Sequence, residues 1–324
     1  MLPKEPELSI ILLNIRSVYW TQQHMPSIRE QLPLIPPYSS SQSFIYHGDA
    51  LQILKILPSE IGRTSITSPP YWGLRDYDTS GQIGSETDVN EYVNKLVEVF
   101  HELRRVLTND GTFWLNLGDS YTSGGRTWRA PDKKNPARAM SYRAPTPDGL
   151  KSKDLIGVPW RVAIALQADG WYLRSEIIWH KPNALPESVK DRPTRAHETI
   201  FLFTKNEDYY YDYESVREKG SNGQLRNRRS VWSIHTEPFN GSHFATFPPK
   251  LIEPCVLAGS EKGDYVIDPF FGSGTTGLVA NLQERNFLGI ELKGDYIELS
   301  RKRLGSHGIF FEVIEPNERS RRLA

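Results

Sequence analysis

Short apolar runs alternate with longer amphipathic segments from residue 44 onward. Two segments show helical spacing: residues 89–107, with Tyr92, Leu96, Phe100, Leu103 and Leu107, and residues 158–170, which end at Gly170. The apolar runs are rich in β-branched and aromatic residues and predict strands at 44–47, 65–67, 111–118, 173–179, 199–204, 264–268, 287–292 and 309–314. Strands that alternate with crossover helices predict an α/β fold with a mostly parallel central sheet covered on both faces.

Three segments lack this alternation of strand-like and helix-like patterns. Residues 1–42 end in a Pro/Ser-rich run and are expected to form an arm or linker. Residues 119–155 carry eight Lys/Arg against four Asp, and residues 205–247 include "QLRNRRS". Loops of this length inside a compact domain are usually functional or disordered.

The composition narrows the protein class only slightly. The 324 residues carry 39 basic and 39 acidic side chains, so a nucleic-acid surface would have to come from local clustering. The single cysteine, Cys255, excludes a disulfide framework and cysteine-rich zinc sites, and no metal site is expected. The run "LSIILLNI" is far shorter than the about 20 residues that span a bilayer. A cytoplasmic protein without a membrane partner is the expectation.

A glycine-rich turn points to an adenosine-containing ligand. A predicted strand ends at Asp268, Gly272 and Gly274 follow, and a helix is expected to begin near Thr275. Glu291 ends the next strand, 19 residues after Gly272, where a carboxylate can accept hydrogen bonds from ribose hydroxyls. No lysine follows the glycines, which argues against a P-loop. The G-x-G-x-x-G spacing is a literal match, however, so a nicotinamide-dependent oxidoreductase stays open on this motif alone.

The stretch "TSPPYW", residues 67–72, has a different chemistry. The lone pair of a nucleobase exocyclic amine is delocalised into the ring, and hydrogen-bond acceptors that draw its protons make the nitrogen more nucleophilic. The hydroxyl of Ser68 and an adjacent carbonyl can supply those acceptors. Pro69 and Pro70 fix the backbone without adding N–H donors, and Tyr71 offers a ring for stacking.

Together these motifs resemble the β-class amino-methyltransferases of DNA, which use S-adenosylmethionine. The resemblance rests on "GDAL" (48–51), "TSPPYW", "HFATFPPKLIEP" (243–254) and "DPFFGSGTT" (268–276). It implies a Rossmann-like methyltransferase fold with a circularly permuted motif order, in which the catalytic motif precedes the cofactor motif, and with inserted DNA-recognition loops. Hydride transfer has no use for Ser-Pro-Pro-Tyr, so the oxidoreductase alternative is set aside.

The resemblance also implies roles for individual residues. Ser68 and the Pro69 carbonyl would hold the target amine, Pro70 would stiffen the turn, and Tyr71 would stack on the base. The segment 177–188, with Trp179 and His180, would line the other wall of the base pocket, whereas 196–211 is interpreted as a core strand. The implied cofactor-binding residues are Asp49, Phe247, Asp268, Phe270, Gly272, Ser273, Gly274, Thr275 and Glu291.

The expected partner is double-stranded DNA, from which the target base must be flipped. The implied division is a catalytic half at 43–206, a target-recognition insert at 207–240, a cofactor-binding half at 241–316 and a tail at 317–324. The 119–155 loop is expected to be mobile and to contribute to recognition. The candidate DNA-binding residues are Arg126, Arg129, Lys133, Lys134, Arg226, Arg228 and Arg229.

Two amines fit this chemistry, cytosine N4 and adenine N6. Among relatives, serine at the first motif position is associated mainly with cytosine N4, so Ser68 favours cytosine. Methylation at cytosine carbon 5 needs a cysteine nucleophile, and Cys255 is interpreted as a small core residue instead. An RNA methyltransferase and an inactive DNA-binding relative remain alternatives. The expected setting is a restriction-modification system, with a cognate endonuclease that makes no stable contact, and a monomer or homodimer.

Overall fold

The computed structural model describes residues 32, 42–74, 81–122, 144–237 and 247–315. Within these residues, nine strands form one sheet in the order β11-β1-β10-β9-β2-β3-β5-β4-β8. Their bounds are β1 Phe44–His47, β2 Gly62–Thr67, β3 Leu107–Leu117, β4 Tyr172–His180, β5 His197–Thr204, β8 Val231–Ser233, β9 Tyr265–Asp268, β10 Asn286–Glu291 and β11 Glu312–Ile314. Of these nine strands, β5 alone runs antiparallel to its neighbours, β3 and β4. The prediction of a mostly parallel sheet is confirmed.

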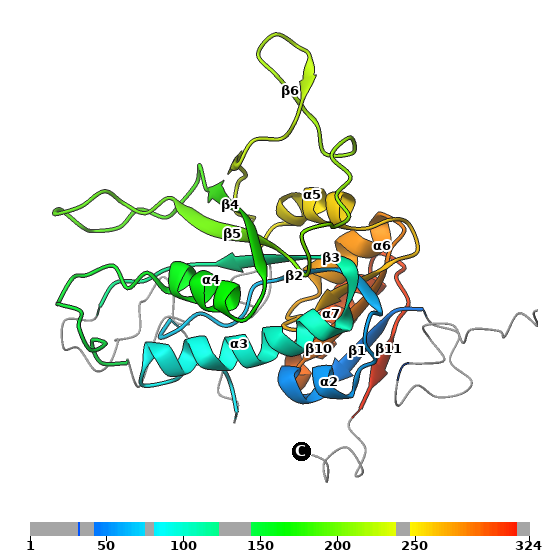
Figure 1. Ribbon diagram of the computed structural model, residues 1–324, viewed down its shortest axis with the longest axis horizontal. Helices are drawn as coiled ribbons and strands as arrows, with labels where there is room; N and C mark the ends of the chain where they lie inside the picture. Colours follow the sequence, from blue (N-terminus) through cyan, green and yellow to red (C-terminus); the bar gives the residue numbers. More distant parts are fainter. Residues whose placement is uncertain (1–31, 33–41, 75–80, 123–143, 238–246, 316–324) are drawn as a thin grey trace, which may run out of the picture.

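Helices cover both faces of this sheet (Figure 1). Buried residues of α2 (Ala50–Ile56), α3 (Val89–Val106) and α4 (Val158–Ala168) belong to one hydrophobic cluster. Those of α5 (Pro249–Gly259), α6 (Thr275–Leu282) and α7 (Gly294–Gly305) belong to a second cluster. The layered α/β architecture therefore agrees with the sequence pattern. None of the helices in the described part of the chain is long and apolar enough to cross a membrane.

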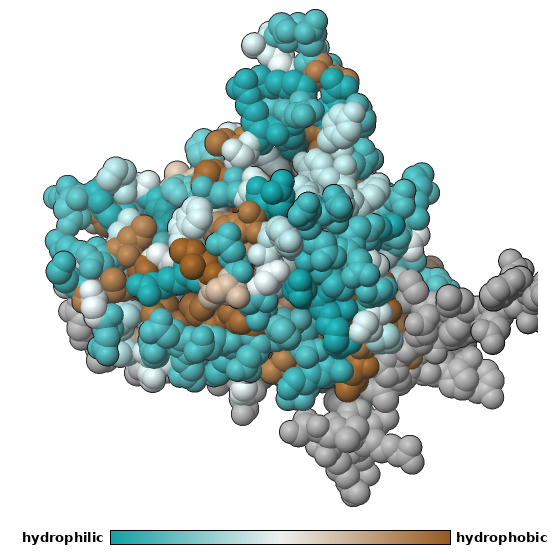
Figure 2. Space-filling view, viewed as in Figure 1, coloured by the Kyte–Doolittle hydropathy of each residue, from teal (hydrophilic) through white to brown (hydrophobic). Residues whose placement is uncertain are grey.

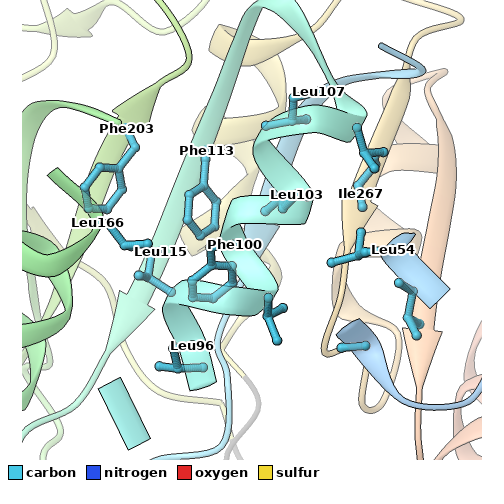
Figure 3. Packing of buried hydrophobic residues seen from close by; sticks show 14 of the residues in the cluster. Leu54, Leu96, Phe100, Leu103, Leu107, Phe113, Leu115, Leu166, Phe203 and Ile267 are labelled. Atoms are coloured by element: carbon cyan, nitrogen blue, oxygen red, sulfur yellow. The ribbon is translucent and has the colours of Figure 1, made fainter. Parts of the chain in front are cut away.

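The helix α3 shows how the sequence builds this layer. Asp88 caps its N-terminus, because the side chain accepts a hydrogen bond from the amide of Asn90 at 3.1 Å. Figure 3 shows Phe100 and Leu103 of α3 directed toward Phe113 of β3, and the rings of Phe100 and Phe113 lie 4.7 Å apart. The sequence pattern extended this helix to Leu107, which is instead extended and begins β3.

The irregular segment 205–247 contains more strand than the sequence suggested. The strand β8 joins the edge of the main sheet beside β4. Two further strands, β6 (Glu218–Lys219) and β7 (Leu225–Arg226), form a separate antiparallel hairpin. In Figure 1 this hairpin projects away from the body of the molecule, and in Figure 2 its surface is largely hydrophilic.

The centre of the sheet contains a topological switch point. The strands β9 and β2 are parallel neighbours, with Thr64 opposite Val266 and Ser65 opposite Ile267. From β9 the chain continues through α6 to β10 on one side, whereas from β2 it continues through α3 to β3 on the other. Ligands of open α/β sheets bind in the crevice at such a point, beyond the carboxyl ends of the strands. The catalytic motif and the glycine turn both begin there.

Candidate active site

A cavity of about 850 Å³ lies at this switch point. Residues from both sequence motifs line it, although the motifs are about 200 positions apart in the chain. The catalytic motif contributes Ser68, Pro69, Pro70 and Tyr71, and the glycine-rich motif contributes Phe270 and Gly272. Two further implied cofactor-binding residues, Asp49 and Glu291, line it as well. A ligand of the glycine turn and a substrate of the Ser-Pro-Pro-Tyr motif would therefore share one space.

The catalytic motif begins directly after β2 and is held by its neighbours. The hydroxyl of Tyr92, from α3, donates a hydrogen bond to the carbonyl of Pro70 at 2.8 Å. In contrast, no described residue donates to the carbonyl of Pro69. The Pro69 carbonyl thus keeps its capacity to accept a hydrogen bond, and the two prolines supply no backbone N–H donor.

Tyr71 lies against the backbone that continues from β3. A Cβ atom at Gly118 would be only 2.6 Å from the Cε2 atom of Tyr71, so only glycine allows the ring to approach so closely. The Tyr71 hydroxyl donates to Glu198 at 2.9 Å and accepts from Ser68 at 3.1 Å. The Tyr71 ring is therefore held by its contact with Gly118 and by the hydrogen bonds of its hydroxyl. These contacts orient the ring without a bound base.

The glycine turn is closed by its acidic partner. Gly272 has a φ of 53°, which favours glycine, and its amide donates to the Glu291 carboxylate at 2.8 Å. The second oxygen of Glu291 accepts from the amide of Lys293 at 2.8 Å. Asp49 caps α2 by accepting from the amide of Gln52 at 3.0 Å. Two carboxylates thus face the cavity from the cofactor side.

These residues fit S-adenosylmethionine better than a dinucleotide. The amide of Gly272, which could bind a phosphate, already donates to Glu291, and a pyrophosphate would lie beside the carboxylates of Asp49 and Glu291. Ribose hydroxyls, an amine and a sulfonium are instead compatible with carboxylate neighbours. The ring of Phe270 supplies an apolar wall, and Lys293 and Tyr296 line the same side.

Asp268 holds the turn through buried hydrogen bonds and is not among the residues that line the cavity. Its carboxylate accepts hydrogen bonds from the hydroxyls of Thr67 and Thr276, each at 2.6 Å, and from the amide of Phe270 at 3.1 Å. Thr67 is the last residue of β2, so this bond joins the catalytic motif to the cofactor motif. Burial raises the pKa of Asp268 to about 6, although the three donors oppose the rise.

Four other implied cofactor residues are also not among those that line the cavity: Phe247, Ser273, Gly274 and Thr275. The guanidinium of Arg303, in α7, donates to the hydroxyls of Ser273 at 3.0 Å and Thr275 at 2.7 Å. Gly274 caps α6 with a φ of 77°. Phe247 packs in the hydrophobic cluster beneath α5, α6 and α7. Direct cofactor contacts by these residues remain predictions, whereas the structure gives Ser273, Thr275 and Gly274 a role in shaping the turn.

The Glu291 carboxylate leads to a test by pH. Burial raises its pKa to about 7, and nearby Asp268 adds to the rise, against the donors Lys293 and Gly272. Because the pKa of Glu291 is higher in the folded than in the unfolded protein, the folded protein binds this proton more tightly. Protonation of Glu291 therefore adds to the free energy of unfolding as the pH falls through 7 toward the ordinary pKa of 4.5. When the pH is lowered from 8 to 5, we expect the free energy of unfolding of the cofactor-free wild type to rise by about 2 kcal/mol more than that of Glu291→Gln. Denaturant unfolding at both pH values measures this, and identical pH dependence in the two proteins would contradict it.

Sequence reasoning missed three polar residues beside the catalytic motif. Glu198 of β5 accepts hydrogen bonds from Tyr71 and, at 3.0 Å, from the side-chain amide of Asn116. Lys181 forms an ion pair with Glu198 and lies over the Trp179 ring, 4.1 Å from its centroid. Lys181 and Glu198 lie in the segments 177–188 and 196–211, which were considered above. The pair His197-Glu198 at the start of an otherwise apolar strand was the feature that could have pointed to Glu198. Trp179 and His180 point elsewhere, toward Ile234 and Ser233.

The candidate DNA-binding residues fall into two groups. Arg126, Arg129, Lys133 and Lys134 lie outside the described residues. The flanks of their segment are described: the amide of Thr122 donates to Asp154 at 2.9 Å, and Asp119 lines the cavity. The described flanks of the basic segment are therefore joined to each other by a hydrogen bond three residues after Asp119.

The second group lies on and after the projecting hairpin. Arg226 pairs with Glu218 across β6 and β7 at 3.0 Å. The Arg228 guanidinium lies over the Trp232 ring, 4.6 Å from its centroid, and Arg229 is exposed. Of the three, Arg229 is the one whose side chain has no partner among the described residues. Contact with DNA stays a prediction for all of them.

Cys255 lies in the interior of α5, where it is 1% exposed and packs in the cluster under α5, α6 and α7. Burial raises the pKa of its thiol above the ordinary range. It does not line the cavity, so it is not placed to attack a base there. Within the described residues there is also no group of three or more His, Cys, Asp or Glu that could hold a metal ion.

Comparison with known proteins agrees with this geometry. A family model described as DNA methylase of the N6/N4 type matches residues 63–302, which is more than half of the chain. The type II methyltransferase M.Cfr9I of Citrobacter freundii is 57% identical over 287 residues, covering 86% of this chain and 96% of that protein. The type II methyltransferase M.SmaI of Serratia marcescens is 60% identical over 259 residues, covering 79% and 89%.

Solved structures show the same fold. The PvuII DNA methyltransferase, described as cytosine-N4-specific, is 25% identical with a TM-score of 0.61, covering 81% of this chain and 86% of that one. The TTHA0409 protein of Thermus thermophilus, solved in complex with S-adenosyl-L-methionine, is 24% identical with a TM-score of 0.58, covering 84% and 99%. The chain therefore belongs to the N6/N4 family of DNA methylases and is an S-adenosylmethionine-dependent DNA methyltransferase.

Proposed function

We propose that this enzyme methylates the exocyclic N4 of cytosine in double-stranded DNA, as the modification enzyme of a type II restriction-modification system. The observation that carries the proposal is that Ser68 and Pro69 line the same cavity as Gly272 of the glycine turn. Two acceptors suit an amine with two protons to donate. The PvuII enzyme, whose name states cytosine-N4 specificity, supports the choice of base. The type II methyltransferases above support the restriction-modification setting.

Duplex DNA buries the amine in a base pair, so the proposal includes base flipping. The cavity of about 850 Å³ is at the upper end of the range for small-ligand sites and can hold a base beside the cofactor. The base would enter between Tyr71 and the wall formed by Lys181 and Asn183. We expect the projecting β6–β7 hairpin and the basic segment 119–155 to contact the duplex around it. The intact catalytic motif in this cavity argues against a binding-only relative.

Single-molecule sequencing tests the reaction, the base and the recognised sequence together. Genomic DNA from cells that express the wild type is compared with DNA from cells that express Ser68→Ala. We expect N4-methylcytosine in one sequence context with the wild type only. N6-methyladenine instead would keep the family and overturn the assignment of the base, whereas no modification by folded wild-type protein would overturn the proposed function as a whole.

A further inference from the structure

A chain of hydrogen bonds leads from the catalytic serine to a buried carboxylate. The Ser68 hydroxyl donates to the Tyr71 oxygen at 3.1 Å, and the Tyr71 hydroxyl donates to the Oε2 atom of Glu198 at 2.9 Å. The side-chain amide of Asn116 braces the chain, with Nδ2 at 2.9 Å from the Tyr71 oxygen and at 3.0 Å from Glu198. It also lies 3.4 Å from Ser68 Oγ.

The carboxylate fixes the direction of every bond in this chain. An ionised carboxylate can only accept, so Tyr71 must direct its single proton to Glu198. The Tyr71 oxygen is then left as an acceptor and takes the proton of Ser68. Because Ser68 directs its own proton inward, its remaining lone pair is available to the cavity. The same logic assigns the Nδ2 atom of Asn116 as the donor to Glu198 and Tyr71.

Glu198 is held in its ionised form. Burial on its own would raise the pKa of Glu198, but the charge and hydrogen bond of Lys181, together with Asn116 and Tyr71, lower it below the ordinary value. Lys181 is itself fixed over the Trp179 ring. Burial and the Glu198 charge raise the pKa of Tyr71, so the phenol keeps its proton. The Tyr71 phenol therefore stays neutral and donates its proton to the ionised carboxylate of Glu198.

We propose that Glu198 is a positioning residue for methyl transfer, which acts through Tyr71 to hold Ser68 as a hydrogen-bond acceptor for the substrate amine. This inference rests on the proposed function, in which the substrate is an amine that donates a hydrogen bond to Ser68. The exocyclic nitrogen becomes nucleophilic as its protons are drawn to Ser68 and Pro69. Without the carboxylate, Tyr71 and Ser68 can reverse their bonds, and the Ser68 proton then points at the amine.

Glu198→Gln tests this most directly, since it keeps the shape and removes the charge. We expect kcat to fall about 100-fold, as for other lost alignments at a reacting centre, with an unchanged Kd for S-adenosylmethionine. Glu198→Asp, which keeps a charge, should retain more activity than Glu198→Gln. Glu176→Gln is the matched control, because Glu176 is exposed on the neighbouring strand β4 and should keep wild-type kcat.

A double-mutant comparison separates positioning from general loss of structure. Tyr71→Phe interrupts the same chain while the Glu198–Lys181 ion pair stays intact. If Glu198 acts through Tyr71, adding Glu198→Gln to Tyr71→Phe lowers kcat little further. Multiplying effects, or full kcat in Glu198→Gln, would overturn the inference. Should Glu198→Gln fail to fold, Tyr71→Phe alone must show the loss of kcat at unchanged cofactor affinity, and undiminished kcat in that variant overturns the inference.

The same assay distinguishes this inference from the proposed function. Wild-type protein that transfers no methyl group to cytosine overturns the proposed function. Wild-type transfer to cytosine, together with an undiminished Glu198→Gln rate, overturns the role of Glu198 alone.

Discussion

Ser68→Ala is expected to lower kcat for methyl transfer to DNA by about 100- to 1000-fold, the range found when one hydrogen bond to a developing charge is removed. Ser68 and Pro69 both line the cavity. In the proposed function the Ser68 hydroxyl and the Pro69 carbonyl accept the two amine protons, and alanine at position 68 leaves only the carbonyl. The cofactor side of the cavity, with Asp49 and Glu291, is untouched. The Kd for S-adenosylmethionine should therefore match that of the wild type. Transfer of a labelled methyl group at saturating DNA and cofactor measures kcat.

Ser65→Ala is the matched control for this variant. Ser65 lies on the same strand, β2, and its hydroxyl is buried without a hydrogen-bond partner among the described residues. Its removal leaves no donor or acceptor unpaired, so wild-type kcat is expected. Equal activity of Ser68→Ala and Ser65→Ala would show that Ser68 does not hold the amine. A weaker affinity of Ser68→Ala for S-adenosylmethionine would show that Ser68 contributes to cofactor binding, which the account does not predict.

Gly289→Ala is expected to lower the free energy of unfolding by about 2–3 kcal/mol, at the upper end of the range for overpacked cores. A Cβ atom at Gly289, in β10, would be 2.4 Å from the ring of Phe271. The ring cannot retreat, because it stacks on Phe287 with centroids 5.4 Å apart and fills the space above Gly277. Denaturant unfolding measures the loss.

The same substitution should also weaken cofactor binding. Phe271 is part of the turn between Asp268 and Gly272, and its amide donates to the carbonyl of Ile290 at 2.9 Å. A displaced ring therefore moves the residues that line the cavity. Gly305→Ala serves as the control, since no other part of the described chain, apart from the adjoining residues and the backbone of α7, comes within 4 Å of the added methyl group. Wild-type stability and cofactor affinity in Gly289→Ala would contradict this account of the turn.

The sequence predicted the parts of the fold that depend on local pattern. Apolar runs located eight of the nine strands of the sheet, all except the short β8, and Asp268 followed by glycines located the turn at the end of β9. The shared edge of parallel strands then explains why Ser68 and Gly272 meet in one cavity despite their separation in the chain. The two short strands of the β6–β7 hairpin carry too few residues to show a period, so the pattern could not find them.

Residues that act through long-range contacts could not be predicted in this way. Glu198 opens an apolar strand, and nothing in its neighbourhood along the chain shows that β5 brings it to Tyr71 and Lys181. Likewise, Asp268 was assigned to the cofactor pocket, and only the packing of β2 beside β9 shows that Thr67 occupies its carboxylate. Sequence motifs identify the residues that are chemically unusual, whereas their hydrogen-bond partners depend on the topology.

The central claim is that this cavity brings the methyl group of S-adenosylmethionine to the exocyclic N4 of cytosine. The most direct test supplies purified protein with cofactor carrying a deuterated methyl group and with duplex DNA from a host that lacks methylation. Mass spectrometry of the digested nucleosides then locates the label. The account predicts deuterated N4-methyldeoxycytidine. Label found instead in N6-methyldeoxyadenosine or 5-methyldeoxycytidine, or in no nucleoside although the cofactor binds, would contradict it.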